Sequence, residues 1–297
     1  MIEIKNVVFT KVQMDFLNSF FCFLNYLLPL RLKFKNESFV ILEDNIKNAL
    51  ITLDKDSKSN TRFKITKLVL EENSFSNVVE LVKYVTTRYR AMGANSFYIV
   101  IDEKNPDLLN LFKNELNFRH CAMEYLFKVE NLNKNYAINL KHPKKESIKN
   151  ITDFYNENIN SFNRFLFSRE KYQFKNNFLK YVFLGENEEI LGYFEVATND
   201  NVDFYLNFTL DCTYNIYLMD AIKAIYSKLS RKYKNFNLYI KVKDYFLNSK
   251  ELLAILKEND IKFISKSLIL AKDYYKPVKA NDILKNAKII FNDPTTA

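Results

Sequence analysis

The sequence repeats one order of elements at a spacing of about 141 residues, and this repeat constrains its fold more than any other feature. Ile99 and Ile240 lie in matching apolar stretches 141 positions apart, and Phe127 and Ile269 lie 142 positions apart. A constant offset of one domain length is typical of an internal duplication. At 297 residues the chain has room for two domains of ordinary size. We therefore expect two tandem copies of one α/β fold.

Each copy shows the same succession of patterns: strand, helix, hairpin, long strand, helix, strand, helix, strand. In the first copy, Val78, Val82, Val85 and Tyr89 recur at helical spacing. Phe97–Ile101 is a continuous apolar run, which is typical of a strand covered on both faces. The patterns predict a mixed, mostly antiparallel sheet flanked by helices in each copy, and so two sheets in the α+β class.

Two more elements are expected near the start of the copies. A helix should run from Met14 to Leu28 and stop before Pro29, which cannot continue it. In the second copy, Ala137 to Leu140 should form a strand.

The boundary between the copies is expected in the polar, basic stretch from Asn131 to Lys145, which contains Pro143. Domain boundaries fall in such stretches because few contacts cross them. This prediction gives a first domain of residues 1–133, a second of residues 134–275 and a tail of residues 276–297.

Glycine is scarce, at only three positions in the chain: Gly93, Gly185 and Gly192. A backbone that wraps around a phosphate needs glycine at several positions of one loop. The scarcity excludes a glycine-rich nucleotide loop of the Walker or Rossmann type.

The three cysteines, Cys22, Cys121 and Cys212, are scattered, and the chain holds two histidines. These residues have no metal-ligand spacing and suit a reducing compartment, so we expect no metal and a cytoplasmic protein. The most apolar stretch, Met14 to Leu32, is interrupted by Asp15 and by Pro29, so we expect no membrane span.

The formal net charge is +9, which favours anionic partners such as phosphorylated cofactors. One basic patch is expected in the second copy, at Lys228, Arg231, Lys232, Lys234, Lys241 and Lys243. It could meet a phosphate, but a solvated helix face is the simpler interpretation. We do not expect nucleic-acid binding.

Three segments of the first copy resemble the GNAT superfamily of acyl-CoA-dependent N-acyltransferases. Residues 89–101 resemble the family's helix end and fifth strand, where a Gly-Ala pair precedes aliphatic residues. Residues 105–112 resemble its Asn-x-x-Ala-x-x-Leu-Tyr helix, and Asn117-Phe118-Arg119 stands where the family has Gly-Phe-Arg. The second copy is similar to the family by pattern and by residues 237–263.

The resemblance implies a tandem GNAT-like chain that uses acetyl-CoA or another acyl-CoA and a small-molecule or peptide amine as acceptor. In the family, the loop between the fourth strand and the next helix holds the pyrophosphate through backbone N–H groups. The implied cofactor-binding residues are Val69, Leu70, Ser74, Phe75, Ser76, Asn77 and Asn105.

The chain departs from the family pattern at the cofactor loop and at the general acid. Phe75 stands in place of the family's Arg or Gln, and Val78 and Glu80 stand in place of its small residues. In the second copy, residues 211–217 hold no glycine and begin with Asp211. Phe112 replaces the tyrosine that returns a proton to the leaving thiolate, which should slow the reaction.

The resemblance places the catalytic base at Glu71 or Glu72, which end the fourth strand. Asp102 and Glu103 end the fifth strand on the other side of the same opening. The alternative is that all four are solvated acids at strand ends.

Three functions stay open at this stage. The chain is an N-acyltransferase, a catalytically inactive binding or scaffold protein with the same fold, or an aminoacyl-tRNA-dependent transferase. The oligomeric state is not predicted by these patterns.

Overall fold

The computed structural model describes residues 2–7, 36–43, 46–55, 61–70, 75–130, 132, 136–170, 178–198 and 200–274. The helix expected from Met14 to Leu28 and the tail of residues 276–297 lie outside the described residues.

The first half of the chain follows the expected order of elements. Its elements are β1 (Ile2–Val7), β2 (Asn36–Glu43), β3 (Ile46–Lys55), β4 (Arg62–Leu70), α2 (Phe75–Ala91), β5 (Ser96–Asp102), α3 (Pro106–Asn110), a π-helical turn η1 (Leu111–Glu115) and β6 (Arg119–Val129).

After four helical segments, the second half repeats this order from β2 onward. Its elements are η2 (Lys145–Ser147), α4 (Ile148–Glu157), η3 (Ser161–Asn163), α5 (Arg164–Phe167), β7 (Phe178–Leu184), β8 (Ile190–Thr198), β9 (Asp203–Leu210), η4 (Cys212–Tyr217), α6 (Leu218–Lys232), β10 (Asn237–Lys243), α7 (Ser249–Glu258) and β11 (Lys262–Asp273).

The strand expected from Ala137 to Leu140 does not form. Residues 136–140 belong to no strand, and the neighbouring Lys141 makes an isolated bridge to Val182. Ile138 and Leu140 are nevertheless buried in the core of the second half. Their apolar character therefore reports burial and not strand pairing.

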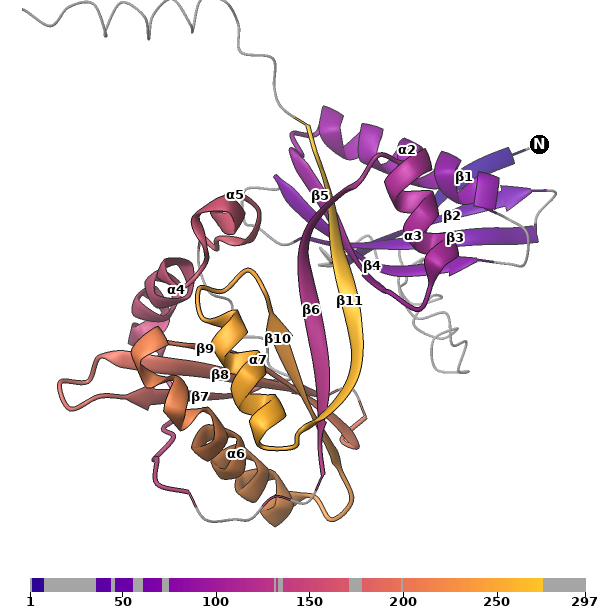
Figure 1. The fold of residues 1–297 in the computed structure, drawn as a ribbon. Helices are drawn as coiled ribbons and strands as arrows, with labels where there is room; N and C mark the ends of the chain where they lie inside the picture. The colour runs from indigo at the N-terminus through magenta and orange to yellow at the C-terminus, as the bar shows by residue number, and fades with distance from the viewer. Residues whose placement is uncertain are drawn as a thin grey trace, which may run out of the picture.

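The strands described form one sheet in the order β1-β2-β3-β4-β5-β11-β6-β10-β9-β8-β7. Only the β4–β5 and β9–β10 pairs are parallel, and all the other neighbours are antiparallel. This mixed, mostly antiparallel sheet with helices on it confirms the expected fold class. The two sheets that the sequence suggests are joined into one (Figure 1).

The two halves exchange their last strands at the joint. Strand β11 of the second half pairs with β5 of the first, as Leu270 does with Ile99. Strand β6 of the first half pairs with β10 of the second, as Phe127 does with Ile240. β6 and β11 also pair with each other, so they form the centre of the sheet.

The duplication is preserved in the register of the two parallel pairs. The first residue pair is Arg62↔Ser96 in one half and Asp203↔Asn237 in the other, and both members are shifted by 141 positions. The offset deduced from the apolar stretches is therefore confirmed in the strand pairing.

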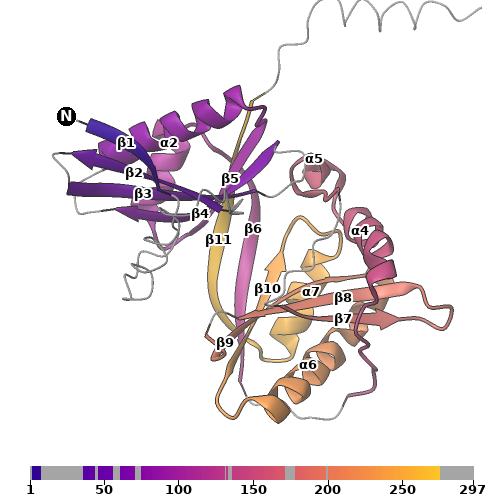
Figure 2. The same cartoon turned by 180° about the vertical axis from the view of Figure 1, so that it is seen from behind.

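Helices α2, α3, α6 and α7 cover one face of the sheet, which is the front in Figure 1. They bury one apolar core in each half, around residues such as Phe97 and Leu81 in the first and Phe204 and Ile222 in the second. Figure 2 shows the sheet from behind, with these helices behind the strands.

A third core lies on the other face, where α4 and α5 pack over the central strands. It contains Tyr155, Phe167, Tyr193 and Ile269. Arg62 of β4 is almost fully buried, and its guanidinium donates to the carbonyl oxygens of Leu166 and Ser168 around the end of α5. The first half thereby anchors a helix of the second.

Candidate active site

Strands β4 and β5 part near the middle of the first half. They pair from Arg62↔Ser96 to Ile65↔Ile99, and beyond this point β4 continues to Leu70 and β5 to Asp102 without pairing to each other. Parallel strands that separate leave backbone groups of both without ladder partners. We call the place where β4 and β5 separate the strand opening.

Helix α2 begins directly beyond this opening. Its apolar residues Val78, Leu81, Val82 and Val85 are fully buried and hold one face of the helix on the sheet. It ends at Ala91, and Gly93 in the turn that follows has a φ of +102°, which suits glycine, while the Ala94 N–H donates to the Tyr89 carbonyl at 2.9 Å. Its start follows β4 along the chain, as does the helix that the resemblance expects to hold the cofactor.

No charged residue within the first turn of α2 opposes the positive end of its dipole, and the basic residues of its last turn offset the negative end. Its first turn holds no acidic residue, and its last turn holds Arg88 and Arg90. Helix N-termini attract anions because their first N–H groups have no partner within the helix. The only acid near the start of α2 among its residues is Glu80, which is exposed.

An open cavity of about 340 Å³ lies between α2 and the α3–η1 segment. It is lined by Ser76 and Val79 from α2, Asp107 and Asn110 from α3, and Leu111 and Glu115 from η1. A second cavity of about 590 Å³ shares Ser76 and Val79 and continues along α2 past Glu80, Lys83, Tyr84, Thr87 and Arg88. Both cavities meet at the first turn of α2.

Asn105 is the N-cap of α3 at the edge of this region. Its side-chain oxygen accepts from the Leu108 N–H at 3.2 Å, and Pro106 occupies the first helical position. The residue is exposed, so its amide NH₂ can still face solvent or a ligand. Its role in the fold is helix capping.

Phe112 is fully buried, and its ring packs edge-on against Phe118 with centroids 5.0 Å apart. It therefore belongs to the core of the first half and has no hydroxyl for a leaving group. Asn117 has a φ of +56°, the left-handed conformation for which the family's glycine is suited. Asparagine tolerates this conformation better than most residues.

The predicted site residues whose side chains the structure describes lie in α2 and at the start of α3. Ser76 lines both cavities, Asn77 lies in the first turn of α2, and Asn105 caps α3. Val69 and Leu70 end β4 and Phe75 begins α2, but their side chains lie outside the described residues. The same is true of Glu71, Glu72 and Ser74 as whole residues.

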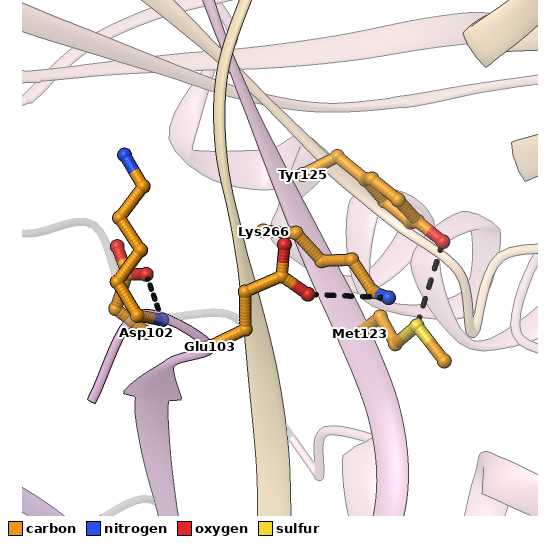
Figure 3. A network of polar contacts seen from close by, with 6 residues as sticks. Asp102, Glu103, Met123, Tyr125 and Lys266 are labelled. Atoms are coloured by element: carbon orange, nitrogen blue, oxygen red, sulfur yellow. Dashed lines mark hydrogen bonds and ion pairs between the residues drawn. The ribbon is translucent and has the colours of Figure 1, made fainter. Parts of the chain in front are cut away.

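The two acids that end β5 make local interactions (Figure 3). An Asp102 carboxylate oxygen accepts from the Lys104 N–H at 2.9 Å. The Glu103 carboxylate lies 3.4 Å from the Lys266 ammonium on β11. Both contacts are local, as expected if these acids lie at a solvated strand end and take no part in catalysis.

The matching place in the second half is occupied by the chain itself. Asn248, the N-cap of α7, is nearly fully buried and donates to the Leu210 carbonyl at 2.8 Å and to the Asn215 side chain at 2.6 Å. Asp211 accepts from the Thr213 N–H at 2.8 Å. The Leu210 carbonyl at the strand end and the Thr213 N–H in η4 therefore already have partners.

Metal-site, thiolate and membrane-spanning features find no support among the described residues. In the described part of the chain, no three His, Cys, Asp or Glu side chains gather as a metal site would require. Burial raises the pKa of Cys121 and of Cys212, which disfavours a thiolate nucleophile at either position. No helix among the described residues is both long and apolar enough to cross a membrane.

Sequence reasoning missed the cavity between α2 and the α3–η1 segment. Val79, Asp107, Asn110 and Glu115 are surface positions of two separate helices, and no local pattern brings them together. The one available signal was the family position of the Asn105 helix, which places it beside α2.

Comparison with solved structures identifies the same fold elsewhere. A GCN5-related N-acetyltransferase from Sphaerobacter thermophilus superposes with a TM-score of 0.56 at 10% identity, over 81% of this chain and 82% of that one. A tandem GNAT protein from the clavulanic acid biosynthesis pathway superposes with a TM-score of 0.51 at 6% identity, over 82% and 84%. No family model and no curated protein matches the sequence.

These similarities cover both halves of the chain, and the parallel strand pairs recur 141 positions apart. The protein therefore has a tandem GNAT-like fold.

Proposed function

We propose that the protein is an acyl-CoA-dependent N-acyltransferase with its site in the first half. The observation that carries the proposal is the parting of β4 and β5 beside the first turn of α2 and the 340 Å³ cavity. The second half, whose matching groups are bonded to Asn248 and Asp211, then supports the fold of the first.

The residues present fit an acyl-CoA in part. Ser76 and Asn110 can hydrogen-bond to the amide groups of its flexible arm, and Val79 and Leu111 give apolar walls. The start of α2 can receive phosphate. Asp107 and Glu115 oppose it, because carboxylates repel a polyanion in the same cavity.

The reaction would join an amine to the acyl group at the strand opening. The amine nitrogen attacks the thioester carbonyl carbon, the C–N bond forms, the C–S bond breaks and the thiolate leaves. Glu71 or Glu72 would take the proton of the ammonium through one water. Phe112 has no proton to donate, but a thiol with an ordinary pKa of about 8.5 can leave as the thiolate, at a lower rate.

Calorimetry with acetyl-CoA and the full chain tests the binding step. We expect a dissociation constant in the high micromolar range or weaker. Val79→Trp should abolish the heat because Val79 lines both cavities, whereas Val202→Trp, at an exposed site of the second half, should leave it unchanged. Submicromolar binding would contradict the effect assigned to the missing glycines and the two acids.

Acylation of a panel of polyamines, amino acids and peptides tests the chemical step. The rate should rise with pH as the acceptor amine loses its proton.

A non-catalytic binding protein is the second candidate, favoured by the buried Phe112 and the acidic cavity. It takes precedence if the wild type acylates no amine in the panel and gives no heat with the thioester.

A further inference from the structure

The described sheet has two ends, and its outermost strands are β1 and β7 (Figure 1). A strand at the end of a sheet has a neighbour on one side only, and the N–H and C=O groups of every second residue point away from that neighbour. Such groups can pair with another strand unless something covers them. The two ends of this sheet differ in how they are covered.

At the β7 end, the chain covers its own edge. The Lys141 N–H donates to the Val182 carbonyl at 3.0 Å, and the Val182 N–H donates to the Lys141 carbonyl at 2.8 Å. The His142 Nδ1 lies 3.0 Å from the carbonyl oxygen of Lys180. Pro143 follows, and proline has no N–H with which to continue a ladder. A further strand is therefore blocked at this end.

At the β1 end, the edge is a regular strand. β1 pairs with β2 over its whole length, from Ile2↔Glu43 to Val7↔Ser38. Among the described strands it has no neighbour on its other side. Lys141 takes the position beside β7 that β1 takes beside β2, so both halves have an outermost segment, but only in the first half is that segment a strand.

The residue order of β1 is complementary to its own reverse. In Ile2-Glu3-Ile4-Lys5-Asn6 the acid and the base stand at equal distances on either side of Ile4. If two copies of β1 pair antiparallel about Ile4, Glu3 of each copy lies opposite Lys5 of the other. Opposite charges at directly opposed positions favour a strand pair, and like charges disfavour it. Registers centred on Glu3 or on Lys5 would set like charges against each other.

We propose that β1 is the interface of a two-fold symmetric dimer, in which β1 of a second copy pairs with it antiparallel about Ile4. The charge complementarity of the strand with itself favours a second copy over an unrelated peptide, and a two-fold axis closes the assembly because each β1 then has a neighbour on both sides. An edge of six residues is smaller than a standard interface, so we expect a weak dimer with a dissociation constant on the order of 10–100 µM. The proposal does not depend on acyl transfer.

Sedimentation equilibrium of the full chain over a range of concentrations, at low ionic strength, measures this association. Glu3→Lys should weaken it about tenfold, because both symmetry-related pairs become like-charged. Lys5→Glu should weaken it to a similar extent for the same reason. An equimolar mixture of the two variants should associate about as tightly as the wild type, because the mixed pair again sets opposite charges against each other.

Glu146→Lys and Lys149→Glu are the matched controls. Both residues are exposed in the second half, and the two substitutions repeat the same changes of net charge. Neither should alter the association. Recovery in the mixture would also show that both β1 variants are folded.

The proposal is overturned if the wild type stays monomeric up to about 1 mM, a concentration well above the expected dissociation constant. It is also overturned if a dimer forms and both β1 variants keep the wild-type affinity, if the mixture does not recover it, or if Lys149→Glu weakens the association as much as Lys5→Glu. Glu3→Gln with Lys5→Gln removes both charges without adding repulsion and provides a comparison should a charge reversal not fold. This neutral variant should associate several-fold more weakly than the wild type, and an unchanged affinity would contradict the pairing of Glu3 with Lys5.

Discussion

At the scale of single residues, Phe112 and Asn117 show what a change of side chain means at a fixed backbone position. Phe112 is buried against Phe118 and fills the core without a hydroxyl. Asn117 keeps the left-handed turn that follows the helix. The first substitution alters chemistry and the second preserves shape, so the fold can persist where catalysis is slowed.

Glu71 and Glu72 carry the proposed base, and their replacement tests it. Glu71→Gln with Glu72→Gln should lower the acylation rate by about 10²-fold, at the lower end for a lost general base. Steady-state rates with the best acceptor of the panel provide the measurement.

The matched control is Asp102→Asn with Glu103→Gln. These acids already contact the Lys104 N–H and the Lys266 ammonium, so the rate should stay within about twofold. Equal losses in the two double variants would remove the distinction between the strand ends, and an unchanged rate in the first would make the assignment wrong.

Glu124 should make the free energy of unfolding depend on pH in the acid range. Burial by itself raises its pKa, but nearby lysines, chiefly Lys241 and Lys243, bring it below the ordinary value in the folded protein. The ionised carboxylate therefore stabilises the fold above its ordinary pKa, and this contribution is lost as the pH falls through the lower, folded value. Urea unfolding between about pH 6 and about pH 3 should show a shallower loss of stability in Glu124→Gln than in the wild type. Parallel curves would mean that Lys241 and Lys243 do not act on this carboxylate.

At the scale of elements, the sequence predicted what local periodicity encodes. The buried stripe of α2 and the burial of β5 follow from apolar spacing, and both form as expected. Residues 137–140 show the limit, because an apolar run is equally suited to packing under a helix without strand pairing. The cavity beside α2 depends on how helices meet, which local spacing does not encode.

Asn105 and Asn248 occupy matching N-cap positions in the two halves, but their side chains make different hydrogen bonds. Asn105 is exposed and caps Leu108, whereas Asn248 is buried and holds Leu210 and Asn215. A buried carbonyl that loses its donor costs more than an exposed cap. Among the described residues, the cap of the first half is therefore exposed and that of the second half is buried.

Alanine at each position should separate the two roles. Asn248→Ala should lower the free energy of unfolding by about 2–3 kcal/mol, and Asn105→Ala by about 1 kcal/mol. Acetyl-CoA heats should weaken only in Asn105→Ala. Urea unfolding and calorimetry on the same preparations check both, and a larger loss of stability in Asn105→Ala would reverse the assignment of the two caps.

At the scale of the whole molecule, the sequence predicted two copies but not their exchange of strands. The offset of 141 positions fixes which strands correspond. It does not decide whether β6 closes its own half or the other, because β6 and β11 are of similar length and present the same backbone N–H and C=O groups to either neighbour. Only the three-dimensional pairing distinguishes the two topologies.

The exchange predicts how the chain should behave when it is cut between its halves. Strand β6 of the first half lies between β11 and β10 of the second half. Strand β11 of the second half lies between β5 and β6 of the first half, so the last strand of each half pairs on both sides with strands of the other half. A protease site inserted after Lys134, within the predicted boundary, should be cleaved without separating the fragments, because the β6–β11 ladder and the Arg62 contacts with Leu166 and Ser168 remain. Gel filtration of the cleaved protein should give one peak at the volume of the intact chain, and two peaks should appear only in denaturant.

The same insertion after Gly185, in the β7–β8 hairpin, serves as the control for cleavage itself. Two peaks from the Lys134 variant in native buffer would show that each half closes on its own strand in solution.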